Sequence, residues 1–118
     1  MNNRKWNCHN EYQGKYKRVL CVCSAGLLRS PTTALVLAKS PFNFNTRSCG
    51  LDTGHALIPI DSILLEWADE VVCMTTEQYA RLKEMTNKQI VCLNIGDLYE
   101  YQDPKLISLI RERYTANT

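Results

Sequence analysis

Short apolar runs alternate with helix-like segments four times along this chain. Strands that alternate with helices imply a parallel sheet whose two faces are both covered. The sequence therefore predicts an α/β fold, a three-layer sandwich with a four-stranded parallel sheet and helices on both faces. The predicted strands are residues 18–23, 43–50, 69–75 and 88–95, and the predicted helices are residues 30–40, 59–68, 75–85 and 103–114.

Particular residues mark the starts and the buried faces of the helices. Ser30 followed by Pro31 is typical of an N-cap and the first helical position. Thr75 and Gln78 have the spacing of a capping box. Helical periodicity predicts two apolar faces, one made by Ile60, Ile63, Leu64 and Trp67 and the other by Leu106, Ile107, Leu109 and Ile110.

The length of the chain indicates one domain, and its composition does not indicate a membrane or nucleic-acid partner. A chain of 118 residues with a formal charge of +2 gives no reason to expect a nucleic-acid or membrane partner. Residues 1–16 are polar and read as an arm, which leaves residues 17–118 as the domain. The start lacks the apolar core of a secretory signal, so we expect a cytoplasmic protein whose six cysteines are reduced.

The first predicted strand ends in a cysteine, and an arginine follows six positions later. Such a strand–loop–helix passage can bind a phosphate, because loop amides and a helix N-terminus converge on the anion. An arginine adds a planar pair of donors. The Gly-x4-Gly-Lys-Ser/Thr pattern of nucleotide-binding loops is absent from the sequence. The predicted phosphate-binding loop after the first strand comprises Ser24, Ala25, Gly26, Leu27, Leu28 and Arg29.

Cys23 would lie at the base of this loop, where the positive field favours its nucleophilic thiolate. Ser30 can donate a hydrogen bond to that thiolate, and Arg29 can bind two phosphate oxygens. One loop would then bind a phosphoryl group and present a nucleophile to it. The alternative interpretation is a buried strand cysteine, with Ser30 as an ordinary helix cap.

The stretch VCSAGLLRSP, at residues 22–31, resembles the signature of the low-molecular-weight protein tyrosine phosphatases, and most closely a short bacterial and phage branch of them. Asp103-Pro104 and the blocks EWADEVVCM and YEYQDPKLISLI resemble later parts of that family. The likeness extends over residues 17–114, with strong identity only in these blocks. It implies a phosphatase domain that works through a phosphocysteine intermediate, with no metal and no cofactor. Phosphate, sulfate and vanadate would be its ligands.

The chain differs from this family at three places. Gly26 stands where the family usually has an asparagine that supports the loop. Leu28 stands where many members have a second cysteine, which is a redox partner for the first. Lys105 and Leu106 follow the Asp-Pro pair, where an aromatic pair is frequent. These differences bear on loop rigidity, redox behaviour and preference for phosphotyrosine.

Asp103 is the predicted general acid. A phosphate ester's leaving oxygen must be protonated as the P–O bond breaks, and the carboxylate can then serve as the base for water. Spacing alone favours a plain helix N-cap at Asp103. The resemblance to the phosphatase family favours the acid role there, and Asp97 is the second choice for the acid. Leu27, Tyr99 and Tyr101 are the predicted substrate pocket, although these tyrosines could also pack or face solvent.

The other cysteines read as small core residues. Cys49, Cys73 and Cys92 lie in strand-like runs. A metal site is not supported, because Cys8, His9 and His55 lack the spacing of metal ligands.

The function predicted from these residues is that of a phosphomonoester hydrolase, specifically a protein tyrosine phosphatase. Its substrate would be a phosphotyrosine protein or a small aryl phosphate. Two alternatives stay open. An arsenate reductase would need resolving thiols close together, and Cys73 and Cys92 are far apart in the sequence. A catalytically silent phosphate-binding module is the other alternative.

Overall fold

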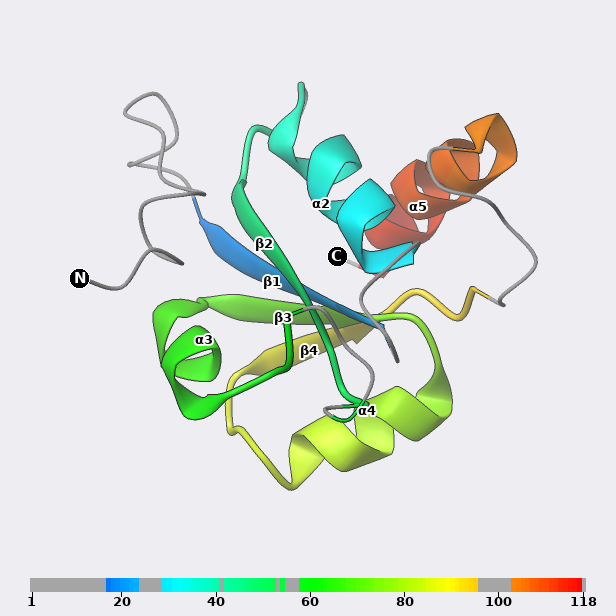
Figure 1. Cartoon of the computed structure of the whole chain (residues 1–118). Helices are drawn as coiled ribbons and strands as arrows, with labels where there is room; N and C mark the ends of the chain where they lie inside the picture. Colours follow the sequence, from blue (N-terminus) through cyan, green and yellow to red (C-terminus); the bar gives the residue numbers. More distant parts are fainter. Residues whose placement is uncertain are drawn as a thin grey trace.

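The computed structural model describes residues 17–23, 29–40, 42–52, 54, 58–95 and 103–117 of the chain. Four strands alternate with four helices (Figure 1), as the sequence predicts. Among these residues, none of the helices is both long enough and apolar enough for a membrane span. The elements are β1 (Arg18–Cys23), α2 (Arg29–Ala38), β2 (Asn45–Gly50), α3 (Ser62–Trp67), β3 (Glu70–Cys73), α4 (Thr76–Lys83), β4 (Gln89–Cys92) and α5 (Pro104–Ala116).

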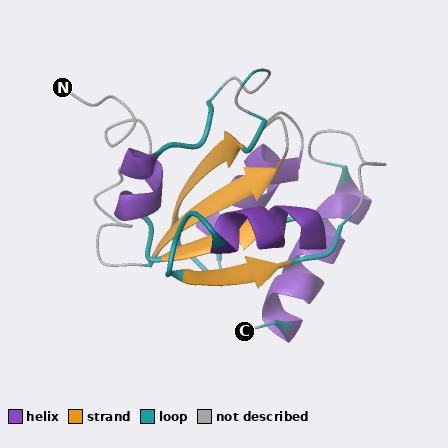
Figure 2. Cartoon of the chain, turned by 90° about the horizontal axis from the view of Figure 1, so that it is seen from below, coloured by secondary structure: helices purple, strands orange, loops and turns teal. Residues whose placement is uncertain are grey.

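The four strands form one parallel sheet in the order β2-β1-β3-β4. Their arrowheads all point to the same edge in Figure 2. Strand β1 is central: it pairs with β2 on one side and with β3 on the other. The chain therefore turns in opposite directions after β1 and after β2. Parallel sheets bind their ligands outside the carboxyl ends of the strands at such a switch in strand order.

Two apolar layers bury the two faces of the sheet. On one face, α2 and α5 supply Val36, Leu37, Leu106 and Ile110, which pack on Val19 and Val72 of the strands. On the other face, α3 and α4 supply Leu64, Trp67 and Leu82, which pack on Leu20 and Val71. Figure 1 shows the same two pairs of helices on opposite sides of the sheet. The predicted three-layer α/β sandwich is confirmed.

Helices α3 and α4 each begin with a side-chain cap, one of them the predicted capping box. The Thr75 side chain accepts a hydrogen bond from the Gln78 amide, and the Gln78 side chain accepts from the Thr75 amide, which completes the capping box. Asp61 caps α3 by accepting a hydrogen bond from the Leu64 amide at 2.9 Å.

Three details differ from the prediction. Helix α2 begins at Arg29, so Ser30 lies within its first turn and is not the N-cap. The short helix α3 buries Leu65 and exposes Ile63, because only six residues are helical and Ile60 lies before them. A lysine directly before a predicted strand is expected to be solvated, but Lys17 lies half-buried at the amino edge of the sheet.

At this amino edge, a buried polar cluster joins β1, β3 and α5. The Tyr114 hydroxyl donates a hydrogen bond to Glu70 Oε1 at 2.7 Å, and Lys17 Nζ donates to Glu70 Oε2 at 3.1 Å. Lys17 Nζ also donates to the Tyr114 hydroxyl at 3.2 Å. The Phe42 and Phe44 rings contact the Tyr114 ring edge-on, with centroids 5.3 and 5.7 Å away. The three polar groups satisfy one another within an aromatic surround.

Candidate active site

Cys23 is the last residue of the central strand, at the carboxyl edge of the sheet. Only 3% of its surface is exposed, and its backbone carbonyl accepts a hydrogen bond from the Leu51 amide at 2.9 Å. Its side chain belongs to the apolar layer under α2 and α5. The structure thus places the predicted nucleophile where parallel sheets bind their ligands.

Helix α2 begins at Arg29, so five residues separate the end of β1 from the start of the helix. The first four amides of a helix have no partner within it, and they carry the positive end of the helix dipole. The predicted phosphate-binding loop therefore lies between a strand and a helix, as such a site requires. Residues 24–28 of the predicted loop, including Gly26 and Leu28, lie outside the described residues, and so do the side chains of Arg29 and Ser30.

Asp103 also lies at the carboxyl edge, as the orientation of α5 shows. Tyr114, near the end of this helix, contacts Lys17 and Glu70 at the amino edge. Eleven helical steps carry the chain back about 16 Å to Asp103, and six strand steps from Lys17 to Cys23 cover about 20 Å. Figure 2 shows α5 beginning on the side toward which the arrowheads point. The two predicted catalytic residues therefore belong to the same edge of the sheet.

Asp103 caps α5. Its Oδ1 accepts a hydrogen bond from the Lys105 amide at 2.9 Å, Pro104 opens the helix, and the side chain is half-buried. The N-cap interpretation is therefore confirmed, and it leaves room for the catalytic one. A carboxylate at a cap is held in one orientation, and its second oxygen can still face a substrate.

One residue that positions this region, Arg113, has no motif in the sequence that would identify it. The Arg113 guanidinium donates hydrogen bonds to the carbonyls of Leu93 and Asn94, at 3.1 and 3.0 Å. Asn94 has a φ of 58°, in the left-handed region. Arg113 thus fastens α5 to the chain that leaves β4 and leads toward Asp103. Three other predicted site residues on that segment, Asp97, Tyr99 and Tyr101, lie outside the described residues.

Three of the other thiols lie in the buried core. Desolvation is the main cause that raises the pKa of Cys21, Cys49 and Cys73, and nearby thiols add to it. The raised pKa favours the neutral thiol over the thiolate in all three residues. The prediction that Cys49 and Cys73 are core residues is confirmed, and Cys92 is half-buried.

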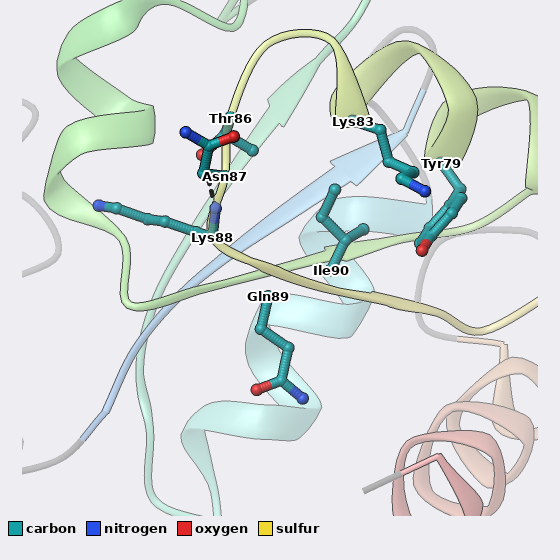
Figure 3. A pocket seen from close by; sticks show the side chains of 7 residues that line it. All are labelled: Tyr79, Lys83, Thr86, Asn87, Lys88, Gln89 and Ile90. Carbon is teal, nitrogen blue, oxygen red and sulfur yellow. Dashed lines mark hydrogen bonds between the residues drawn. The ribbon is translucent and has the colours of Figure 1, made fainter.

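A cavity of about 390 Å³ lies away from this site, between α4 and the start of β4 (Figure 3). Its two lysines are already engaged. Lys83 Nζ lies 5.4 Å from the centre of the Tyr79 ring. Lys88 Nζ extends toward α3 and donates to the carbonyls of Leu65 and Glu66, at 2.7 and 2.6 Å. Because this cavity is at the amino end of β4, Cys23 cannot act on a ligand bound there.

In the described part of the chain, no group of three or more histidine, cysteine or acidic side chains could hold a metal ion. Cys8, His9 and His55, which were weighed as ligands from the sequence, lie outside that part.

No family model matches the sequence, and no curated protein matches it significantly. Solved structures do match. The tyrosine phosphatase Wzb from Escherichia coli K30, in complex with phosphate, is 15% identical, with a TM-score of 0.65 over 86% of this chain and 95% of that one. Vibrio vulnificus Wzb, in complex with benzylphosphonate, is 18% identical, with a TM-score of 0.68 over 86% and 96%.

A third similar structure is the YwlE arginine phosphatase from Geobacillus stearothermophilus. It is 19% identical to this chain, with a TM-score of 0.61 over 85% of this chain and 91% of that one. At such identities the likeness concerns the fold. The chain has the fold of these tyrosine and arginine phosphatases, as its resemblance to the low-molecular-weight tyrosine phosphatases predicts.

Proposed function

We propose that this chain is a phosphomonoester hydrolase, a protein tyrosine phosphatase that acts through a phosphocysteine intermediate. One observation carries the proposal: Cys23 ends the central strand at the switch in strand order, and a helix begins six residues later with Arg29. Similar structures that bind phosphate and benzylphosphonate support the same class of ligand. Residues 17–118 would form the phosphatase domain.

In this mechanism Cys23 attacks phosphorus in line with the leaving oxygen. A P–S bond forms as the P–O bond breaks, and the oxygen takes a proton from Asp103. The amides of residues 24–28 and the Arg29 guanidinium stabilise the three equatorial oxygens as charge develops on them. Ser30 stabilises the thiolate, both before attack and when it leaves. Water then attacks the phosphocysteine, and Asp103 accepts its proton.

The substrate would be a phosphotyrosine protein or a small aryl phosphate, with phosphate, sulfate and vanadate as further ligands. Leu27, Tyr99 and Tyr101 would contact its ring. The Asp103 cap fits the acid role, because the hydrogen bond from Lys105 fixes one oxygen and orients the carboxyl group.

For the arsenate reductase alternative, the positions of the cysteines in the fold matter more than their spacing in the sequence. Cys73 and Cys92 are far apart in the sequence, but the structure makes them direct partners on neighbouring strands. Their separation in the sequence therefore does not exclude this alternative. Cys23, however, packs under α2 and α5, whereas Cys73 and Cys92 pack on the opposite face of the sheet. A thiol relay would have to pass from one face to the other.

The direct test is hydrolysis of para-nitrophenyl phosphate without metal or added thiol. The proposal expects turnover, which Cys23→Ser abolishes while vanadate or phosphate still binds. The matched control is Cys21→Ser, two residues earlier on the same strand, which should keep most of the activity. Binding of phosphate with no turnover by the parent protein would indicate the silent module. Substantial turnover by Cys23→Ser would exclude the mechanism.

A further inference from the structure

Two thiols outside the candidate active site face each other across neighbouring strands. Cys73 and Cys92 are register partners in the parallel pair β3–β4, and each is the last residue of its strand. Both side chains belong to the layer under α3 and α4. Burial is the main cause of the raised pKa of Cys73, and the neighbouring Cys92 thiol adds to it. The Cys73 thiol donates a hydrogen bond to the Thr75 carbonyl at 3.7 Å.

The backbone spacing suits a bond between these sulfurs. Neighbouring strands lie about 4.8 Å apart, and disulfides join Cα atoms that are about 4.4–6.8 Å apart. A pair in register on one face of the sheet meets this Cα requirement. Strand β4 is at the edge of the sheet, so a small adjustment toward β3 is not opposed by a further strand.

The remaining described cysteines do not meet the same requirement. Cys49 is on the same face as Cys73, but β1 lies between their strands, so their Cα atoms are about 10 Å apart. Cys21 and Cys23 are two residues apart on one strand, at about 6.5–7 Å. Cys49 and Cys23 occupy neighbouring strands, but their side chains belong to opposite layers.

We propose that Cys73 and Cys92 form a redox-active dithiol whose oxidation is independent of the proposed nucleophile Cys23. Cys92 reacts first, because it is half-buried and Cys73 is fully buried. Hydrogen peroxide oxidises the Cys92 thiol to a sulfenic acid and releases water. The Cys73 sulfur then attacks the Cys92 sulfur, an S–S bond forms, and the hydroxyl leaves as a second water with the Cys73 proton.

The oxidised pair would fasten the edge strand β4 to β3. Cys73 lies directly before Met74, whose amide donates to Gln78 Oε1 at 2.8 Å at the start of α4. The disulfide would therefore close a loop that contains the whole of α4, from one strand end to the next. Because the pair faces α3 and α4, this oxidation leaves the Cys23 thiol on the other layer in place.

The test uses the full chain with Cys8→Ser and Cys23→Ser, so that its outcome does not depend on phosphatase activity. Of the six cysteines, these two changes leave four. After a hydrogen peroxide pulse we expect a mass loss of about 2 Da, since a disulfide removes two hydrogens, and two alkylatable thiols in place of four. Dithiothreitol should restore all four.

Peptide mapping assigns the bond. Trypsin alone leaves Cys49 and Cys73 on one peptide, so cleavage at Glu66 or Glu70 is needed to separate them. We expect a link between Cys73 and Cys92, abolished by Cys92→Ser and kept in Cys49→Ala. Peptide mapping of the unsubstituted chain checks that the Cys73–Cys92 disulfide does not arise only because Cys8 and Cys23 have been replaced. A mass gain of about 16 or 32 Da without cross-linking, a bond to another cysteine, or a surviving 2-Da loss in Cys92→Ser would overturn the proposal.

Discussion

Replacing Tyr114 with phenylalanine removes one hydroxyl from the buried cluster and keeps the ring between Phe42 and Phe44. The hydroxyl makes two hydrogen bonds to charged groups, at 2.7 Å to Glu70 and 3.2 Å from Lys17. Hydrogen bonds of this kind contribute about 1.5–3 kcal/mol each. Because Lys17 still pairs with Glu70 in the variant, we expect a total loss of about 2–3 kcal/mol in the free energy of unfolding.

Urea unfolding at neutral pH measures this loss, and thermal unfolding should show a Tm lower by about 10 °C for a domain of this size. The matched control is Tyr79→Phe. Tyr79 is half-buried, and its hydroxyl makes no hydrogen bond to the part of the chain described in the structure, so this control should change stability by less than about 0.5 kcal/mol. A Tyr114→Phe variant as stable as the control would refute the stabilising role of the cluster.

The same variant has a pH signature. Burial, and next the Glu70 carboxylate, raise the pKa of Tyr114 above its ordinary value. A group whose pKa is raised by folding contributes fully to the free energy of unfolding at pH values below its pKa in the unfolded chain, which is about 10 for tyrosine. This contribution is lost as the pH rises above that value. The stability difference between the parent chain and Tyr114→Phe should therefore shrink above about pH 10. A stability difference that widens above about pH 10 would contradict a raised pKa for Tyr114.

Three further predictions concern the site and one surface pair. Asp103→Asn should slow phosphotyrosine hydrolysis more than para-nitrophenyl phosphate hydrolysis, with a total loss of about 10²–10⁴-fold in kcat; an equal, small effect on both would leave Asp103 as a cap only. Arg29→Lys keeps the charge and loses the planar pair of donors, so steady-state kinetics should show most of the activity gone. Hydrogen bonds from Arg18 lower the pKa of Asp69, and the pair is exposed, so Asp69→Asn should cost under about 1 kcal/mol by urea unfolding at pH 7. That cost should vanish as pH falls below about 4, through the lowered pKa, and persistence at pH 2 would refute the assignment.

Local signals in the sequence predicted the architecture well where a short stretch determines the structure. The capping box of Thr75 and Gln78 and the apolar run that ends at Cys23 each specify an element through their own residues. The alternation of such elements then fixes a parallel sheet, because a strand and its parallel neighbour need a crossover helix.

Features that depend on contacts between residues far apart in the sequence could not be predicted from short stretches of it. Lys17 looked like a solvated strand start, because its partners Glu70 and Tyr114 lie 53 and 97 residues away. The register of β3 and β4, which no local pattern reveals, is what brings Cys73 beside Cys92. In α3, periodicity assigned Ile63 to the core, but the helix is too short for that periodicity to hold.

For the candidate site, the spacing of the loop predicted the nucleophile, and the resemblance to the low-molecular-weight tyrosine phosphatases predicted Asp103 as the acid. The structure adds that both residues belong to one edge of the sheet, through the orientation of α5. The structure also shows that Arg113 binds the chain that follows β4, and no sequence motif predicts this contact. The side-chain geometry around the phosphate depends on residues 24–30, and the roles given to them stay predictions.

The central claim is that Cys23 carries the phosphoryl group during turnover. Mixing the enzyme with a small aryl phosphate and quenching it under denaturing conditions should trap an adduct of about 80 Da on the protein. Trypsin releases Cys21 and Cys23 on one peptide, residues 19–29, and fragmentation of that peptide should place the adduct on Cys23. Cys21→Ser should keep the adduct and Cys23→Ser should lose it together with turnover. An adduct on another residue, or turnover that persists in Cys23→Ser, would contradict the account.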